Sequence, residues 1–245
     1  MSRWAADLHV HTALSPCAEA EMTPPAIVAA AREKGLAMIA ICDHNSAGNV
    51  AAVQAAAGRG LAVIAGIEIT TAEEVHVLGL FPGAWAARAA GEAVRATLPD
   101  ATAAAAARFG PARVLDAAGR LVGHDGKLLS GASALDLNAA IALIHQRNGL
   151  AIAAHVDRPA FSVLGQLGGI PREARFDGIE VSAAGVAAGR GARLAGLGLP
   201  LVCGSDGHSL GEVGAGRTLL DAREPSFGEL SLALRGLGGR GCVCA

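Results

Sequence analysis

The feature that most constrains the fold is a series of short apolar segments separated by Ala-rich stretches with helical periodicity. Seven of these segments, most of them four to eight residues long, have the length of strands. A strand followed by a helix, repeated along the chain, predicts a mainly parallel sheet with helices outside it. The predicted strands are residues 4–10, 36–42, 61–70, 75–81, 150–155, 178–182 and 199–204.

Helices are expected between these strands, and one interval interrupts the alternation. The first helix follows Thr23-Pro24-Pro25 and ends at Gly35. Residues 82–133 contain an Ala-rich stretch and then a predicted hairpin around Asp125-Gly126. We interpret this interval as an insertion or small cap within a single domain of residues 1–245, because about 50 residues is near the lower limit for an independent core. Further helices are predicted at residues 48–57, 134–147, 185–197 and 225–234.

Composition excludes several classes of function. The 245 residues carry a net charge of −2, so no general field attracts nucleic acid or an acidic membrane. Aromatic residues make up 3% and Tyr is absent, which disfavours base stacking on long nucleic acid. No apolar run has the roughly 18 residues that a membrane helix needs. The five cysteines show no disulfide spacing, and we interpret Cys242 and Cys244 as part of a tail. A cytoplasmic protein is expected.

Residue types that bind metal ions stand where the predicted strands end. In parallel α/β folds the C-terminal ends of the strands lie at one face, so these side chains are expected to meet. His9 and His11 are two residues apart in an extended strand and point to the same side, as two ligands of one ion do. The set comprises His9, His11, Asp43, His44, Glu68, His76, His155, Asp206 and His208.

Each member of this set also has a structural interpretation. A single strand-end His is usually hydrogen-bonded within the structure, and Asp43 and Asp206 are possible helix caps. Glu68 lies in the apolar run AVIAGIEIT, where an unpaired carboxylate costs several kcal/mol. Five such signals at five strand ends are hard to attribute to chance, so the sequence predicts a metal site.

The motifs DLHVHT, CDHN, GIE with a downstream His, AAH and GSDGH occur in this order. Together they resemble the metal motifs of the PHP (polymerase and histidinol phosphatase) superfamily, over about four-fifths of the chain. The segment LSPCAEAEMTP is similar to a stand-alone bacterial branch. The resemblance implies an α/β fold, a distorted (β/α)7 TIM-like barrel with a small insertion, and a centre of two or three divalent ions (Mn, Fe or Zn). It also implies a metal-dependent phosphoesterase that acts by attack of a metal-bound hydroxide.

The resemblance also implies a ligand set. His9, His11 and Asp206 match the ligands of one ion, with Glu68 bridging to a second, and Glu68, Asp206 and His208 match the catalytic positions. His76 and His155 match the second ion, His44 and His208 the third, and Asp43 is expected to orient His44. Where the family commonly has an Asp for the third ion, this chain has Glu19, which we favour, or Cys17.

Arg158 in the motif HVDRP is the candidate for binding the substrate phosphate, with a surface ion pair to Asp157 as the alternative. The expected substrate is a small phosphorylated compound, such as a nucleotide or another phosphomonoester or diester. A histidinol-phosphatase-like enzyme and a non-catalytic, metal-stabilised interaction module are alternatives. An amidohydrolase is a further one, but the lysine that often bridges its metals has no strand-end counterpart, since the chain has only Lys34 and Lys127.

Overall fold

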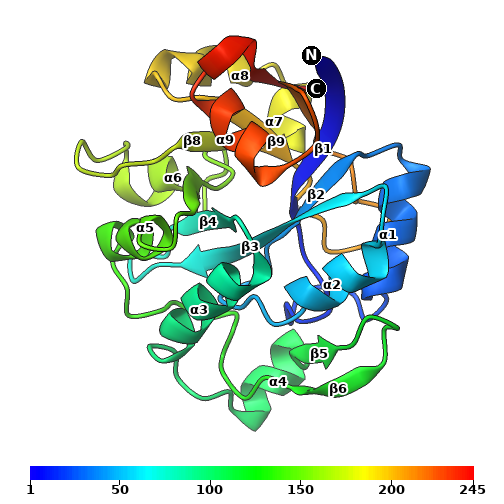
Figure 1. Ribbon diagram of the computed structural model, residues 1–245. Helices are drawn as coiled ribbons and strands as arrows, with labels where there is room; N and C mark the ends of the chain where they lie inside the picture. The colour runs from blue at the N-terminus through cyan, green and yellow to red at the C-terminus, as the bar shows by residue number, and fades with distance from the viewer.

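A computed structural model describes residues 1–245. Nine strands form one sheet in the order β11-β10-β1-β2-β3-β4-β7-β8-β9, and β9 returns to contact β1, so the sheet is a nearly closed barrel (Figure 1). The predicted α/β barrel is therefore confirmed. The strands are β1 (Ser2–Val10), β2 (Met38–Ile41), β3 (Ala62–Thr70), β4 (His76–Phe81), β7 (Leu150–Ala153), β8 (Gly178–Ser182), β9 (Leu201–Gly204), β10 (Thr218–Ala222) and β11 (Gly241–Cys244).

Helices cover the outside of this barrel. In Figure 1, α1 and α2 lie on one side of the barrel and α5 and α6 on the other. None of the helices is long and apolar enough to cross a lipid bilayer. The helices are α1 (Pro24–Glu33), α2 (Val50–Ala57), α3 (Ala84–Arg95), α4 (Ala103–Phe109), α5 (Leu137–His145), α6 (Val163–Leu167), α7 (Ala183–Ala187), α8 (Gly191–Leu194) and α9 (Phe227–Leu234), with 3-10 turns at Ala195–Leu197 and Leu237–Gly239.

The expectation of a mainly parallel sheet is wrong. Four strand pairs are parallel, namely β1–β2, β2–β3, β7–β8 and β8–β9. The other four are antiparallel, namely β3–β4, β4–β7, β1–β10 and β10–β11. The connection between β3 and β4 is too short for a crossover, so β4 runs back along β3. As a result, the first residue of β4 lies at the same rim of the barrel as the last residue of β3.

Two further sequence expectations are corrected. Cys242 and Cys244 do not lie in a tail, because they belong to β11, which pairs with β10 and extends the sheet. The single helix expected at residues 185–197 is divided into α7, α8 and a 3-10 turn. Gly189, between α7 and α8, has a φ of +70°, a left-handed conformation that ends a helix.

The 82–133 segment contains α3, α4 and a separate hairpin of β5 (Arg113–Leu115) and β6 (Leu121–His124). In Figure 1, α4 and this hairpin lie together at the end of the molecule away from both termini. The hairpin turn is at residues 116–120, so its prediction at Asp125-Gly126 is wrong. The Asp116 carboxylate accepts hydrogen bonds from the backbone N–H groups of Ala118 and Arg120 at 2.9 Å, which closes the turn at this earlier point.

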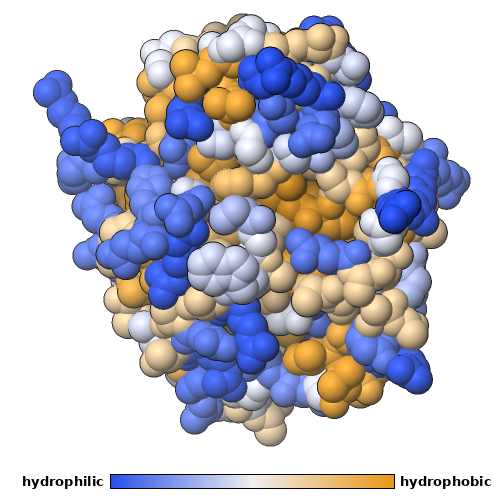
Figure 2. All heavy atoms as spheres, viewed as in Figure 1, coloured by the Kyte–Doolittle hydropathy of each residue, from blue (hydrophilic) through white to orange (hydrophobic).

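Two apolar cores hold the barrel. The larger one, of 41 buried residues, lies between the sheet and the helices and includes Ile27, Ile39, Val50 and Ile67. The smaller one, of 17, combines residues of β1, β2, β3, β4, β7, β9 and β10 in the barrel interior with residues of α9. Figure 2 shows hydrophilic and hydrophobic residues interspersed over the surface seen in this view.

Candidate metal centre

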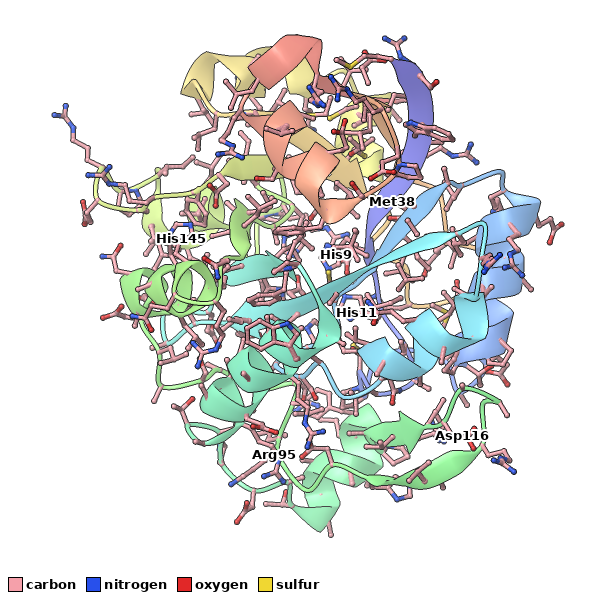
Figure 3. The ribbon with its side chains drawn as sticks, in the orientation of Figure 1. His9, His11, Met38, Arg95, Asp116 and His145 are labelled. Carbon is pink, nitrogen blue, oxygen red and sulfur yellow. The ribbon has the colours of Figure 1, made fainter.

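The predicted ligands lie at one rim of the barrel. His9 and His11 are at the end of β1, Glu68 is near the end of β3, and His76 is the first residue of β4. The reversed direction of β4 therefore explains why a ligand precedes a strand here. His155 follows β7 and Asp206 follows β9. Figure 3 shows His9 and His11 in the middle of the barrel, whereas His145 lies on α5 at its outside.

Glu68 is at the centre of this arrangement. Its Oε1 is 2.9 Å from Nδ1 of His76 and 3.3 Å from Nε2 of His155. Its Oε2 is 2.8 Å from Nδ1 of His44. The Glu68 side chain is fully buried, and burial would raise its pKa. The charges of His76, His9 and His44 outweigh this effect and hold the pKa well below its usual range, so Glu68 is a carboxylate.

A second group of ligand atoms adjoins Glu68. Nε2 of His9 and Nε2 of His11 face each other at 3.1 Å. Oδ1 of Asp206 is 2.9 Å from Nε2 of His11 and 3.3 Å from Nε2 of His9, while Oε1 of Glu68 is 3.4 Å from Nε2 of His9. The register between β1 and β2 shifts between Asp7 and Val10, the interval that contains His9.

These side chains form three groups whose ligand atoms all lie within 4.8 Å of one another. Glu68, His11 and His44 each belong to two of these groups, so the three groups are contiguous. The groups are His9, His11, Glu68 and Asp206; His44, Glu68 and His76; and His11, His44 and His208.

The hydrogen bonding of this cluster fits bound cations. Oε2 of Glu68 and Nδ1 of His155 are buried and make no hydrogen bond. His44 is close to that Oε2, but the angles at the contact are not those of a hydrogen bond. Imidazole nitrogens and carboxylate oxygens that converge without a hydrogen-bond donor between them can instead bind a divalent ion. His and carboxylate donors together suit Mn, Fe or Zn.

Sequence reasoning missed Glu180, on β8. Its carboxylate oxygens are 3.0 and 3.1 Å from Nδ1 of His9, and Oε2 accepts a hydrogen bond from the backbone N–H of His155 at 2.9 Å. It therefore orients both residues toward the centre. Glu180 lies in the apolar strand GIEVS, and the argument used for Glu68 applies to it equally.

Asp43 supports the site by a different route from the one expected. Its carboxylate accepts hydrogen bonds from the backbone N–H and hydroxyl of Thr12 and from the hydroxyl of Ser15. Oγ of Ser15 is in turn 2.8 Å from Nδ1 of His11 and accepts from the backbone N–H of His44. Asp43 thus positions His11 and the His44 backbone through Ser15, and its side chain makes no hydrogen bond to the His44 ring.

Two candidate ligands, His155 and Asp206, have strained backbone geometry. His155 has a φ of 28° and Asp206 a φ of 51°, in the left-handed region that residues with a Cβ rarely adopt. Such conformations persist where the surrounding structure imposes them, and they cluster at functional sites. Here the His155 N–H bond to Glu180 helps to impose one of them.

The structure does not bring Glu19 into any of the three groups. Its side chain is exposed, although its backbone N–H donates to the carbonyl oxygen of His208 at 2.9 Å. Cys17 is nearer to the cluster. Burial raises the pKa of its thiol, but interactions with His208 and His44 outweigh this and lower the pKa to about 6.

Arg158 lies at the rim of the cluster, where its guanidinium forms an ion pair with Asp206. The alternative pairing with Asp157 is not observed, because Asp157 contacts Arg190 instead. Neither lysine approaches Glu68. Lys34 donates to the carbonyl oxygen of Gly211, and Lys127 pairs with Asp100. The centre therefore has no lysine that would bridge two metals as in many amidohydrolases.

Comparison with known families agrees with the motif pattern. The sequence model described as PHP domain matches residues 7–162, more than half of the chain, and one described as PHP-associated matches residues 192–236. No curated protein sequence matches significantly.

Several solved structures are similar to this one. The lesion-specific endonuclease PfuEndoQ from Pyrococcus furiosus is 20% identical with a TM-score of 0.74, over 98% of this chain. The chain spans only 58% of that protein, as it does of an endonuclease Q complex with a 27-mer duplex bearing an abasic lesion (18% identity, TM-score 0.69). A protein from Bifidobacterium adolescentis assigned to the metal-dependent phosphoesterases is 22% identical over 84% of this chain and 88% of its own, with a TM-score of 0.56. An amidohydrolase from Chromobacterium violaceum is 22% identical over 85% and 89%, with a TM-score of 0.58. These similarities show the fold.

Proposed function

Since the chain belongs to the PHP domain family, as its motifs predicted, we propose that it is a metal-dependent phosphoesterase that hydrolyses a small phosphoester. The observation that carries the proposal is the position of Glu68. Its Oε1 lies between His9 of one donor group and His76 of another, and its Oε2 faces His44. A carboxylate in this position is suited to bridge two cations.

We assign the residues to ions from these groups and from the family pattern. His9, His11 and Asp206 would hold one ion, with Glu68 shared. His76 would hold the second ion together with His155, which belongs to none of the three groups but whose Nε2 lies 3.3 Å from Oε1 of Glu68. His44 and His208 would hold a third, supported by Cys17 or Glu19. Bound divalent ions would supply Lewis acidity, which lowers the pKa of a bound water and neutralises charge on phosphoryl oxygens. Glu180 and Ser15 keep the imidazoles in the required orientation.

The space above the centre would receive the phosphoester. A cavity of about 290 Å³ is lined by His44, His76, His155, Arg158, Phe161 and His208. Arg158 supplies a guanidinium that binds phosphate in a bidentate manner. In the structure it contacts Asp206, so a phosphate placed between this arginine and the ligands would touch both. His208 is a quarter exposed and lines the same cavity.

We propose direct attack by water, with Glu68 and Asp206 holding the ions in place, and we assign Cys17 to the support of the third ion rather than to nucleophilic attack. Residues 82–133 would act as a cap within a single domain of residues 1–245. We propose a small substrate, a nucleotide or another phosphomonoester or diester. Damaged DNA is the competing class, because the endonuclease Q neighbour was solved with an abasic lesion at its active site.

The test measures metal content and hydrolysis together. Purified protein is loaded with Mn²⁺, Fe²⁺ or Zn²⁺ and assayed with phosphomonoesters, dinucleotides and a duplex containing an abasic site. Glu68→Gln should lose metal and lower turnover by orders of magnitude, whereas the control Glu173→Gln, at an exposed position, should do neither. Full metal occupancy and unchanged activity in Glu68→Gln would overturn the proposed role of Glu68. Cleavage of the duplex, with no hydrolysis of the small esters, would overturn the proposal that the substrate is small. Bound metal with no turnover on any ester would indicate a non-catalytic module.

A further inference from the structure

A cavity lies beside α4, at the end of the molecule away from both termini (Figure 1). Its volume is about 210 Å³. An apolar cavity of about 150 Å³ is large enough to hold benzene, so this one can receive a compound with a single ring. It opens at the surface, because Phe109 and His124 in its wall are exposed. We call it the cap cavity, and its lining includes Pro16, Ala105, Ala106, Phe109, Leu128 and Ser130.

The helix α4 lacks a packing partner on the side of this cavity. None of its seven residues is buried. Ala105, Ala106 and Phe109 lie on one face of the helix and line the cavity. A helix this short is not stable by itself, and in proteins it gains stability when its apolar face is buried. A ligand in the cap cavity would supply the contact that this face of α4 lacks.

The polar groups of the lining indicate which ligand fits. Lys127 pairs with Asp100 at 2.7 Å, and Asp125 pairs with Arg95 at 3.2 Å. Both charges are therefore engaged. In contrast, the hydroxyl oxygen of Ser130 is buried and makes no hydrogen bond, which is uncommon for a buried polar atom. The lining thus favours a neutral, mainly apolar compound with one group that forms a hydrogen bond to Ser130.

One wall of the cap cavity is continuous with the support of the metal ligands. Pro16 lines the cavity and directly follows Ser15. The hydroxyl oxygen of Ser15 is 2.8 Å from Nδ1 of His11 and accepts a hydrogen bond from the backbone N–H of His44 at 3.1 Å. A Cβ atom on Gly110, at the end of α4, would lie 2.8 Å from the carbonyl oxygen of Pro16. A shift of α4 therefore acts on the segment that orients His11 and His44.

A second wall is held by the neighbour of His44. Leu129 and Ser130 line the cavity, and the side-chain amide of Asn45 donates hydrogen bonds to the carbonyl oxygens of Leu129 and Gly131, at 2.9 and 2.8 Å. Asn45 has a φ of 52°, in the left-handed region, so the backbone next to His44 is fixed in an uncommon conformation. Two walls of the cap cavity are thus connected to His44, a ligand of the proposed third ion.

On this basis we propose that the cap cavity is an effector site. It binds a neutral single-ring compound with one hydrogen-bonding group, and its occupancy changes the affinity of the metal centre for its ions. Such coupling is reciprocal, so bound metal also changes the affinity for the compound. Binding in the cavity is independent of the proposed phosphoesterase function, because it needs neither metal nor ester. The coupling rests on the proposed metal centre.

Two simple compounds test the binding. 4-Methylphenol and toluene differ only by a hydroxyl group, and their binding to the metal-free protein is measured by calorimetry. We expect 4-methylphenol to bind with a Kd of roughly 1 mM or below, from the usual affinity per atom of a small ligand. Toluene should bind roughly three- to tenfold more weakly, because it forms no hydrogen bond to Ser130. Ser130→Ala should remove this difference. Failure of both compounds to bind would overturn the proposal.

A pair of variants on α4 locates the binding site. Ala105→Leu places a larger side chain in the cavity and should abolish binding, whereas Leu keeps a high helix propensity. Ala104→Leu is the matched control, since it makes the same substitution at the preceding, exposed position, which does not line the cavity. This variant should bind as the wild type does. Binding that survives in Ala105→Leu would place the compound elsewhere and overturn the assignment.

The coupling is tested by titration of Mn²⁺ into chelator-treated protein, with and without saturating 4-methylphenol. The Kd for Mn²⁺ should change by at least roughly fivefold, the lower end of common allosteric couplings. The change should persist in Ala104→Leu and be absent in Ala105→Leu. An unchanged Kd in the wild type would overturn the effector role. Since no ester takes part, a protein that hydrolyses nothing would refute the phosphoesterase function and leave this result intact.

Discussion

Replacing Glu180 by Gln should weaken metal binding without removing any metal ligand. The two Glu180 oxygens lie 3.0 and 3.1 Å from Nδ1 of His9, and one of them also accepts the His155 N–H at 2.9 Å. Gln keeps the shape but has only one acceptor oxygen, and its amide N–H₂ group cannot accept a hydrogen bond. One of the two residues therefore loses its acceptor, and the His9 imidazole loses the carboxylate that makes it a stronger base.

The magnitude follows from burial. Glu180 is 1% exposed and the His9 side chain 0%, so solvent does not screen their interaction. A hydrogen bond to a charged group contributes about 1.5–3 kcal/mol, which corresponds to roughly 10- to 100-fold in a dissociation constant. Mutation of a residue that orients a metal ligand typically lowers metal affinity by the same factor, roughly 10- to 100-fold. We therefore expect the Kd of the most tightly bound ion to rise by at least roughly tenfold.

The assay titrates Mn²⁺ into chelator-treated protein against a competing indicator at pH 8. At this pH an ordinary imidazole is unprotonated, which reduces competition between protons and metal. Glu173→Gln, exposed and distant from the His9 contact, controls for the change of net charge. Thermal unfolding of both variants without metal separates weaker binding from a damaged fold. A Glu180→Gln protein whose Kd stays within twofold of the wild type would refute the argument that this carboxylate orients His9.

Three further outcomes are expected. Arg158→Ala should raise KM for the best phosphoester by roughly 10- to 100-fold. The metal content measured by mass spectrometry should stay at the wild-type level, because Arg158 pairs with Asp206 but provides no ligand atom. Wild-type kinetics in this variant would contradict the proposed role of Arg158. Cys17, whose thiol pKa is lowered to about 6 although burial opposes this, should react with iodoacetamide at pH 7 well before the other four cysteines, whose pKa values burial raises; peptide mass spectrometry identifies the site, and equal labelling of all five would disprove it. Hydrogen bonds from Arg240 lower the pKa of Glu229 to about 2. A carboxyl group whose pKa is lower in the folded than in the unfolded protein stabilises the fold above its unfolded-state pKa, and this stability is lost as the pH falls through its folded-state pKa. The lower Tm of Glu229→Gln relative to the wild type should therefore be seen at pH 6 and should shrink between about pH 4 and pH 2. A Tm difference that does not change with pH would contradict a stabilising pair of Glu229 and Arg240.

Local sequence patterns were sufficient for an α/β fold and for most of its candidate ligands, whereas the barrel was implied by the family resemblance. The apolar segments have the length and bounds of strands, and a polar residue directly after such a segment must lie at the rim of a barrel. This places His9, His11, Glu68 and Asp206 together without knowledge of any contact. The apolar surroundings of Glu68 also required that it have partners, and the structure supplies His76 and His44.

The missed elements have weak local signals. The strand β10 contains Thr218 and Asp221 among its five residues, and β11 is four residues long with Gly at its start. Segments this short acquire strand geometry from their partners, since β10 pairs with β1 and β11 with β10. The hairpin turn was misplaced for a similar reason, because Asp125-Gly126 has the favoured dipeptide but Asp116 makes the hydrogen bonds.

Local patterns along the chain specify which residue types stand at which strand ends, because apolar runs and periodicity can be read within each segment. The folded arrangement of the segments sets which atoms meet. It reverses β4 so that His76 faces Glu68, brings Glu180 from β8 to His9, and leaves Glu19 outside the cluster while Cys17 approaches His44 and His208. Strand direction, register and loop path depend on contacts between segments that are distant in the chain, and no local pattern records such contacts.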